Sequence, residues 1–159
     1  MALVKNTNAY ADLSEAETYF ADRLDVAAWT AADDPTKSQA LVTATLYLEN
    51  MNWTGNVVSD SQALAFPREG TYFDPRMGTD VLLDPSAVPK RVIDCSLELA
   101  YHFLNNDGIL DDTGRVEDLT VGEIELTKIS VTNTIPAVAK RMITPLLINA
   151  GANSWFRAN

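Results

Sequence analysis

The sequence has few of the residues on which most catalytic and metal sites depend. It contains one cysteine, Cys95, and one histidine, His102, among 159 residues. A single thiol cannot close an internal disulfide, and this pair cannot supply a cysteine-rich zinc site or a histidine cluster. No glycine-rich phosphate loop, G-x-S-x-G elbow or H-E-x-x-H motif occurs either. We therefore expect a protein that is not an enzyme and that needs neither a metal nor another cofactor.

Cys95 and His102 also lack the spacing of a nucleophile and its base. Both fall in one predicted helix, seven residues apart. Two helical turns rise about 10.8 Å, whereas a proton-transferring pair must lie within roughly 2.6–3.2 Å. We expect a small buried thiol and a partly exposed imidazole ring instead.

Long apolar runs are missing as well. No stretch approaches the roughly 18 apolar residues of a membrane-spanning helix. The first residues, Met1–Lys5, lack the basic start and the apolar core of a signal peptide. These absences predict a chain made in the cytoplasm that has no membrane partner.

Basic residues are scarce and unevenly placed. The chain has 12 Lys and Arg against 22 Asp and Glu, a net charge of −10. Such acidity repels phosphate and argues against a dedicated nucleic-acid binder. Residues 1–125 contain all 22 acidic and 8 of the 12 basic residues, a net charge of −14, whereas residues 126–159 contain 4 basic residues and no acid. A basic end on an acidic body predicts docking of that end onto an acidic surface of a partner.

Hydrophobic spacing predicts a mainly α fold, a small helical bundle with a long irregular loop, a short β-strand or hairpin and an extended C-terminal arm. A capping box from Ser14 to Glu17 opens the first helix, and Asp34 before Pro35 opens the second. The strand region alternates with one slip, so a strand pair and a bulged strand both fit. Residues 1–148 then form one domain and residues 149–159 a tail. The expected helices cover about 14–28, 35–52, 89–106 and 136–144, and the strand region covers about 120–132.

Between residues 55 and 89 no hydrophobic period is sustained. Prolines and glycines interrupt the stretch, and a structureless loop of this length usually marks a function or a partner contact. Its aromatic residues Phe66, Tyr72 and Phe73 could stack on nucleobases, but stacking platforms come with basic grooves. Acidic neighbours offset the two arginines of the loop. We therefore expect these rings to pack in a core or an interface.

The end of the chain combines two aromatic rings with a cation in Trp155-Phe156-Arg157. Tryptophan and arginine are typical anchors of protein interfaces. An interface anchor and a frayed terminus remain equally compatible with this pattern.

Several segments resemble one protein family. Trp53-Thr54-Gly55 followed by Gln62-Ala63-Leu64-Ala65-Phe66-Pro67-Arg68 is the most specific match. Weaker matches are Tyr10 with Ser14–Ala21, Ala27-Ala28-Trp29, Pro89 with Glu98-Leu99-Ala100, Val121–Glu125 and Pro136–Leu147. Together these segments are similar to the head-to-tail connector (adaptor, or neck) proteins of tailed bacteriophages. Some members of that family carry a DnaT-like single-strand-DNA-binding label.

The resemblance implies a structural protein of the virion neck. It predicts a helical bundle that assembles as a homo-oligomeric ring, usually a dodecamer, beneath the portal protein. Such a ring also contacts tail or nozzle proteins and extends the channel through which genomic DNA passes without sequence-specific binding. An acidic channel wall would let DNA slide without sticking.

Two sets of candidate contact residues follow from the charge pattern and the resemblance. The portal-docking set is Lys140, Arg141, Trp155, Phe156 and Arg157. Closed rings need different patches on the two sides of each subunit. The subunit-contact set, drawn from the long loop and the strand region, is Phe66, Arg68, Tyr72, Phe73, Arg76, Ile124 and Leu126.

A single-strand-DNA-binding replication accessory protein is the alternative function. The label carried by some connector relatives favours it, and it predicts tight oligonucleotide binding that weakens steeply with salt. The net charge of −10 and the lack of a basic, aromatic groove in the sequence count against it.

Overall fold

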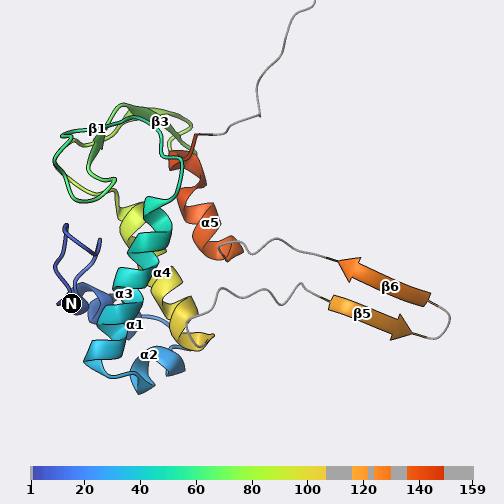
Figure 1. Cartoon of the computed structure of the whole chain (residues 1–159). Coiled ribbons are helices and arrows are strands. Elements are labelled where there is room, and N and C mark those ends of the chain that lie inside the picture. Colours follow the sequence, from blue (N-terminus) through green and yellow to red (C-terminus); the bar gives the residue numbers. More distant parts are fainter. Residues whose placement is uncertain (1, 107–115, 122–123, 130–135, 149–159) are drawn as a thin grey trace, which may run out of the picture.

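The computed structural model describes residues 2–106, 116–121, 124–129 and 136–148, with backbone alone for the second and third ranges. The chain forms a helical body with a small β-rich region at one end (Figure 1). Its helices are α1 Leu13–Ala21, α2 Ala27–Ala31, α3 Asp34–Glu49, α4 Lys90–Asn105, α5 Ala137–Ile143 and the 3-10 turn η1 Thr144–Leu146. The mainly α fold class predicted from hydrophobic spacing is confirmed.

Helix α4 lies at the centre of the body and packs against α2, α3 and α5. It agrees with the predicted helix at 89–106, and Pro89 stands at its N-cap. Full burial of one large apolar side chain contributes roughly 1.5–3 kcal/mol. The apolar residues that recur every three or four positions form the buried stripe Val92, Cys95, Leu99, Ala100 and Phe103.

The first predicted helix is wrong in its length, because the chain divides into α1 and α2. Asp12, not Ser14, caps α1, and its carboxylate accepts the backbone N–H of Glu15. The sequence holds two overlapping capping boxes, and a pattern alone does not rank them. Asp25 then adopts a left-handed backbone (φ 57°), which interrupts the helical path. As a result Leu24, a member of the predicted apolar stripe, is 91% exposed.

Helix α3 corresponds to the predicted second helix at 35–52, but it ends at Glu49 and differs at its N-cap. Asp33, rather than Asp34, is the N-cap residue, and its carboxylate accepts the backbone N–H of Thr36 at 3.0 Å. The N-cap residue is set by backbone dihedral angles. Two adjacent aspartates are equally suited to this position, so the sequence does not show which of them is the cap. The buried face of α3 packs along α4.

Helix α5 confirms the last predicted helix and joins two distant parts of the chain. Ala139 and Ile143 are fully buried where α5 packs on α4. At the last residue of η1, the carbonyl of Leu146 accepts the backbone N–H of Thr54 at 2.8 Å. Two residues later, the backbone N–H of Ile148 donates to the carbonyl of Asn52, also at 2.8 Å. The end of α5 is therefore fastened to the segment that follows α3.

The predicted irregular loop at 55–89 is wrong in one respect, because it contains two short antiparallel ladders. Strand β1 (Asn56–Val57) pairs with β2 (Arg68–Glu69), and β3 (Thr71–Asp74) pairs with β4 (Thr79–Leu82). Strands of two to four residues are too short to show a period of two in the sequence. We refer to residues 55–88 as the platform, which caps one end of the helices (Figure 1).

The strand region is a hairpin, so of the two alternatives the strand pair is correct. β5 (Val116–Val121) and β6 (Ile124–Ile129) pair antiparallel in a constant register, with Val121 opposite Ile124. The hairpin begins earlier than the predicted 120–132. The side chains of the subunit-contact candidates Ile124 and Leu126 lie outside what the structure describes, as do all residues of the tail at 149–159.

Candidate functional site

Cys95 and His102 occupy the predicted environments. The Cys95 thiol is fully buried and donates to the carbonyl of Ala139 at 3.3 Å. Burial raises the pKa of this thiol to about 12. His102 is half-buried beside Asn106. Among the described residues, no cluster of histidine, cysteine and carboxylate side chains could hold a metal ion, and no helix is long and apolar enough to cross a membrane.

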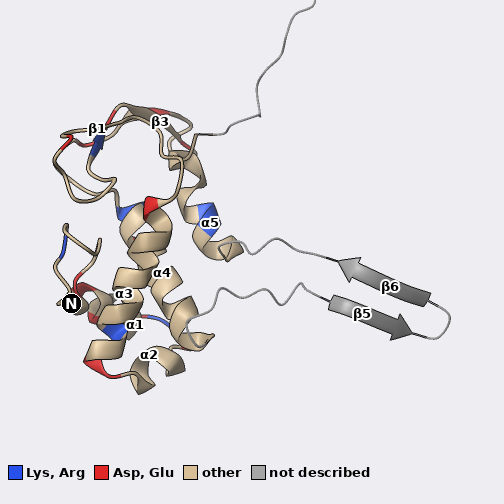
Figure 2. Cartoon of the chain, viewed as in Figure 1, with Lys and Arg blue, Asp and Glu red and all other residues tan. Residues whose placement is uncertain are grey.

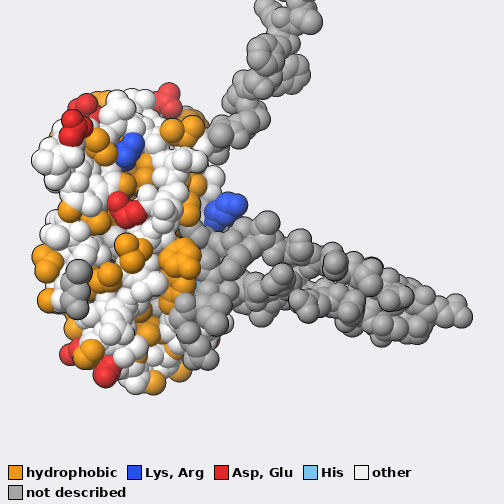
Figure 3. All heavy atoms as spheres, in the orientation of Figure 1, with side chains coloured by type: hydrophobic (Ala, Val, Ile, Leu, Met, Phe, Trp, Pro, Cys, Tyr) orange, Lys and Arg blue, Asp and Glu red, His pale blue; other side chains and the backbone are white. Residues whose placement is uncertain are grey.

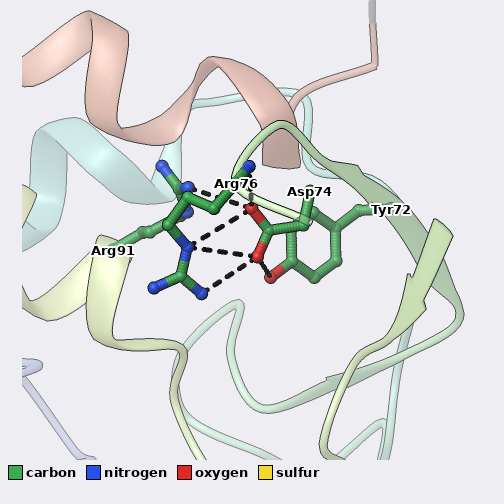
Figure 4. Close-up of polar contacts among 4 residues, drawn as sticks. All are labelled: Tyr72, Asp74, Arg76 and Arg91. Carbon is green, nitrogen blue, oxygen red and sulfur yellow. Dashed lines mark hydrogen bonds and ion pairs between the residues drawn. The ribbon is translucent and has the colours of Figure 1, made fainter. Parts of the chain in front are cut away.

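A buried carboxylate, Asp74, organises the polar contacts of the platform (Figure 4). Its side chain is 1% exposed and accepts the backbone N–H of Arg76 at 2.9 Å and the Arg76 guanidinium at 3.0 Å. Arg91 of α4 donates to the same carboxylate at 3.2 Å, and the Tyr72 hydroxyl donates at 3.3 Å. The hydrogen bonds from Arg76, with the charge of Arg91 behind them, hold the pKa of Asp74 well below its usual range.

Two subunit-contact candidates, Tyr72 and Arg76, are thus already engaged within the chain. Tyr72 is half-buried with its hydroxyl on Asp74. Arg76 keeps 74% of its side chain exposed while its guanidinium pairs with Asp74. Both can reach a neighbour only at the edge of a contact.

Phe66, another subunit-contact candidate, lies in the core of its own chain. Its side chain is 2% exposed and packs edge-on against Trp53, with ring centroids 4.9 Å apart. Tyr10 lies on another side of the same ring at 6.3 Å. An aromatic residue in a proline-rich segment satisfies both a core and an interface pattern, and only the packing separates them.

Arg68 is a brace of the platform backbone. Its guanidinium is half-buried and donates to the carbonyls of Thr54 at 2.8 Å, Gly55 at 2.5 Å and Ala65 at 3.3 Å. Five donors in a fixed fork suit an arginine to hold several carbonyls at once. The Arg68 head group is therefore committed to its own chain.

Among the subunit-contact candidates whose side chains are described, Phe73 is the one that is both exposed and free. It is 55% exposed on the side of β3 opposite Tyr72 and Asp74. The register places Asp80 directly across from Phe73, and Leu82 on the same side at the diagonal position. With Met77 at the turn, these residues form what we call the hairpin outer face: Phe73, Met77, Asp80 and Leu82.

Lys140 and Arg141 carry the free positive charge of the described chain. Where the structure describes side chains, every other lysine and arginine contacts its own chain: Lys5, Arg23, Lys37, Arg68, Arg76, Lys90 and Arg91. Lys140 and Arg141 are exposed and form no ion pair within the described ranges. We call these two residues and Val138, which is 58% exposed, the α5 outer face; the blue segment of α5 in Figure 2 marks its basic residues.

A groove runs between α1 and α4. It encloses about 760 Å³ and is lined by four carboxylates and two cations. Glu98 on its wall pairs with Arg23 at 2.5 Å and accepts the Tyr19 hydroxyl at 2.6 Å. The acidic residues among its lining are Glu15, Asp22, Asp94 and Glu98. Its charge is opposite to that of a nucleic-acid groove.

Sequence reasoning missed Asp74, Asp80 and Arg91. A signal existed for Asp74, because Asp-Pro-x-x-Gly, from Asp74 to Gly78, is a turn signature. The carbonyl of Asp74 accepts the backbone N–H groups of Met77 and Gly78, which closes that turn. No local signal indicates that Arg91, 17 residues later, reaches the same carboxylate.

The geometry defines a helical body, with a small β-rich platform, that carries an acidic groove and a cationic helix. A family model described as "Putative DnaT-like ssDNA binding protein" matches residues 2–159. The chain belongs to this family. No curated protein and no solved structure matches the chain.

Proposed function

We propose that the protein is a head-to-tail connector, a structural component of a phage neck that forms a ring beneath the portal. The observation that carries this proposal is the separation of charge along the chain. All 22 acidic residues lie in residues 1–125, and the acid-free end at 126–159 includes the exposed cations of α5. An acidic body with a cationic end suits a subunit that holds acidic partners at one end and repels DNA elsewhere.

The segment resemblance supports the same function. Trp53-Thr54-Gly55, which leads into the platform, and Gln62–Arg68 within it are its most specific segments, and the Arg68 guanidinium joins them through the carbonyl of Thr54. Trp53 and Phe66 pack on one another there, and Arg68 holds the backbone of both segments. The motif residues of this resemblance therefore maintain the shape of the platform.

Docking on the portal falls to the acid-free end of the chain in this proposal. Trp155, Phe156 and Arg157 supply the anchor of this contact. Deletion of residues 151–159 is expected to abolish co-purification with the portal protein. The control is Leu24→Ser in the full chain, because Leu24 is 91% exposed and lies outside the acid-free part of the sequence. Undiminished portal binding by the shortened chain would falsify the assignment.

Single-strand-DNA binding is the second candidate, and the description of the family favours it. The free cations of α5 are then phosphate contacts. This function predicts submicromolar binding of a labelled oligonucleotide at low salt, with affinity falling steeply as salt rises. Lys140→Ala with Arg141→Ala should weaken that binding. Absence of measurable binding at low salt removes this candidate and leaves the connector.

A further inference from the structure

We infer that the hairpin outer face of one copy packs against the α5 outer face of the next copy. This inference rests on the proposed ring and specifies its subunit contact. The contact joins Phe73, Leu82 and Asp80 of one copy to the apolar and cationic residues of α5 in its neighbour.

The hairpin outer face combines exposed apolar area with unpaired negative charge. Phe73 is 55% exposed, Met77 64% and Leu82 77%. The carboxylate of Asp80, between Phe73 and Leu82 on that side, forms no hydrogen bond or ion pair with any described residue. Contiguous exposed apolar area rimmed by polar groups marks an interaction site. Figure 3 shows apolar and acidic side chains side by side over the platform end.

The α5 outer face has the complementary composition. Val138 is 58% exposed and provides the apolar part. Lys140 and Arg141 provide two positive charges that no described carboxylate neutralises. Fully exposed charges gain little from a lone surface pair, but charges gathered beside apolar area favour and orient an opposite face.

The protein core holds both faces at a fixed separation. Asp74 and Arg91 fasten the inner side of the β3–β4 hairpin to α4, and Leu83, directly after β4, is 5% exposed. Ala139 and Ile143 fix α5 to the same helix. A repeating contact requires such rigidity, because each copy must present its two patches at one constant angle.

Charge selects a head-to-tail arrangement of copies. Two hairpin outer faces placed together would bring Asp80 against Asp80, and two α5 outer faces would bring cations against cations. Each symmetric pairing juxtaposes like charges, which disfavours it. The alternating pairing matches charge and buries apolar area on both sides. Because its two patches differ, it continues from copy to copy and closes into a ring when the rotation allows.

This contact divides the set of residues that the sequence assigned to portal docking. Lys140 and Arg141 face the neighbouring copy, which leaves Trp155, Phe156 and Arg157 for the portal. Removal of the tail then breaks portal binding, whereas charge reversal on α5 breaks the ring.

A charge-swap experiment on the full chain tests the pairing. Ring formation, alone and in the presence of portal, is measured by native mass spectrometry and negative-stain microscopy. Asp80→Lys and Lys140→Glu/Arg141→Glu are each expected to weaken self-association by about tenfold or more, because like charges then meet. The combined protein restores opposite charges and should regain assembly. The matched control is Asp60→Lys, which reverses an exposed platform carboxylate outside the hairpin.

Each outcome decides the inference. Rescue by the combined substitutions supports the pairing. Normal assembly of both charge variants, loss without rescue, or failure of the natural chain to assemble even with portal overturns it. If the α5 variant assembles but loses the portal, α5 docks on the portal and the connector function survives. If rings form, and the charge variants lose and regain assembly as expected, but no ring binds the portal, the connector function fails while the contact between copies stands.

Cysteine cross-linking provides a second readout that does not depend on charge. Phe73→Cys and Val138→Cys in one chain place one thiol on each face, and Cys95 is buried and stays unreactive. A short bismaleimide is expected to produce a ladder of covalent multimers. Each single variant should give dimers at most. A double variant that yields no species beyond the dimer contradicts the head-to-tail contact.

Discussion

Arg91, the second residue of α4, donates a hydrogen bond of 3.2 Å to the carboxylate of Asp74, the last residue of strand β3. This contact joins the platform to the central helix. Asp74 is 1% exposed, so its charge depends on Arg91 and Arg76 in place of water. The position of the hairpin outer face follows from this anchor.

Stability should therefore depend on pH through Asp74. The arginines hold its pKa below that of an unfolded aspartate, about 3.9. A lowered folded-state pKa stabilises the fold at pH values above 3.9, and that contribution is lost as the pH falls from about 4 toward the folded-state pKa. Asp74→Asn should unfold at a lower urea concentration at pH 7. Its free energy of unfolding should also decrease less steeply than that of the natural protein on the acid side of the pH profile. If the free energy of unfolding of the variant falls with acid as steeply as that of the natural protein, other carboxylates govern acid unfolding. Asp80→Asn is the exposed control.

Truncation of two phenylalanines of the platform should change the free energy of unfolding to very different extents. Phe66→Ala removes a ring that is 2% exposed and is expected to lower the free energy of unfolding by about 3–5 kcal/mol. Phe73→Ala removes a ring that is 55% exposed and should change it by less than about 0.5 kcal/mol. Urea titrations followed by tryptophan fluorescence measure both. Equal losses would contradict the division between core and outer face.

Gly55 and Gly78 both have left-handed backbones, with φ of 71° and 67°, but differ in their surroundings. A Cβ at Gly55 would collide with the carbonyl oxygen of Glu69, whereas nothing lies within 4 Å of one at Gly78. Gly55→Ala should destabilise by more than about 1 kcal/mol, and Gly78→Ala by less, since it adds backbone strain alone. Thermal unfolding ranks the two. The reverse order would show that the β1–β2 contact is looser than described.

The Cys95 thiol should resist modification in the native protein. Its pKa is raised to about 12, so almost no thiolate exists at pH 8, and the side chain is fully buried. Reaction with a thiol-specific chromogenic reagent should become fast only in denaturant. Phe73→Cys supplies an exposed thiol as the positive control and should react at once in buffer. Rapid labelling of Cys95 under native conditions would indicate local opening between α4 and α5.

The sequence alone determined the helical framework. The stripe of α4 repeats over its whole length, and only a buried helix face suits that pattern, so its bounds and its buried cysteine were predictable. Capping positions were less predictable, because Asp12 and Ser14 offer overlapping signals and backbone dihedral angles decide between them. Charge segregation was also a property of the sequence, since it requires no coordinates.

Only the tertiary structure decided which side chains remain free. Phe66 and Phe73 lie in one segment, yet one is in the core and the other faces outward. Arg76 and Arg91 converge on Asp74, whereas Lys140 and Arg141 find no partner among the described residues. Pairings of this kind join positions far apart in the chain, and local patterns carry no information about them. A sequence lists the charges of a protein, and the fold determines which of them are available to bind another molecule.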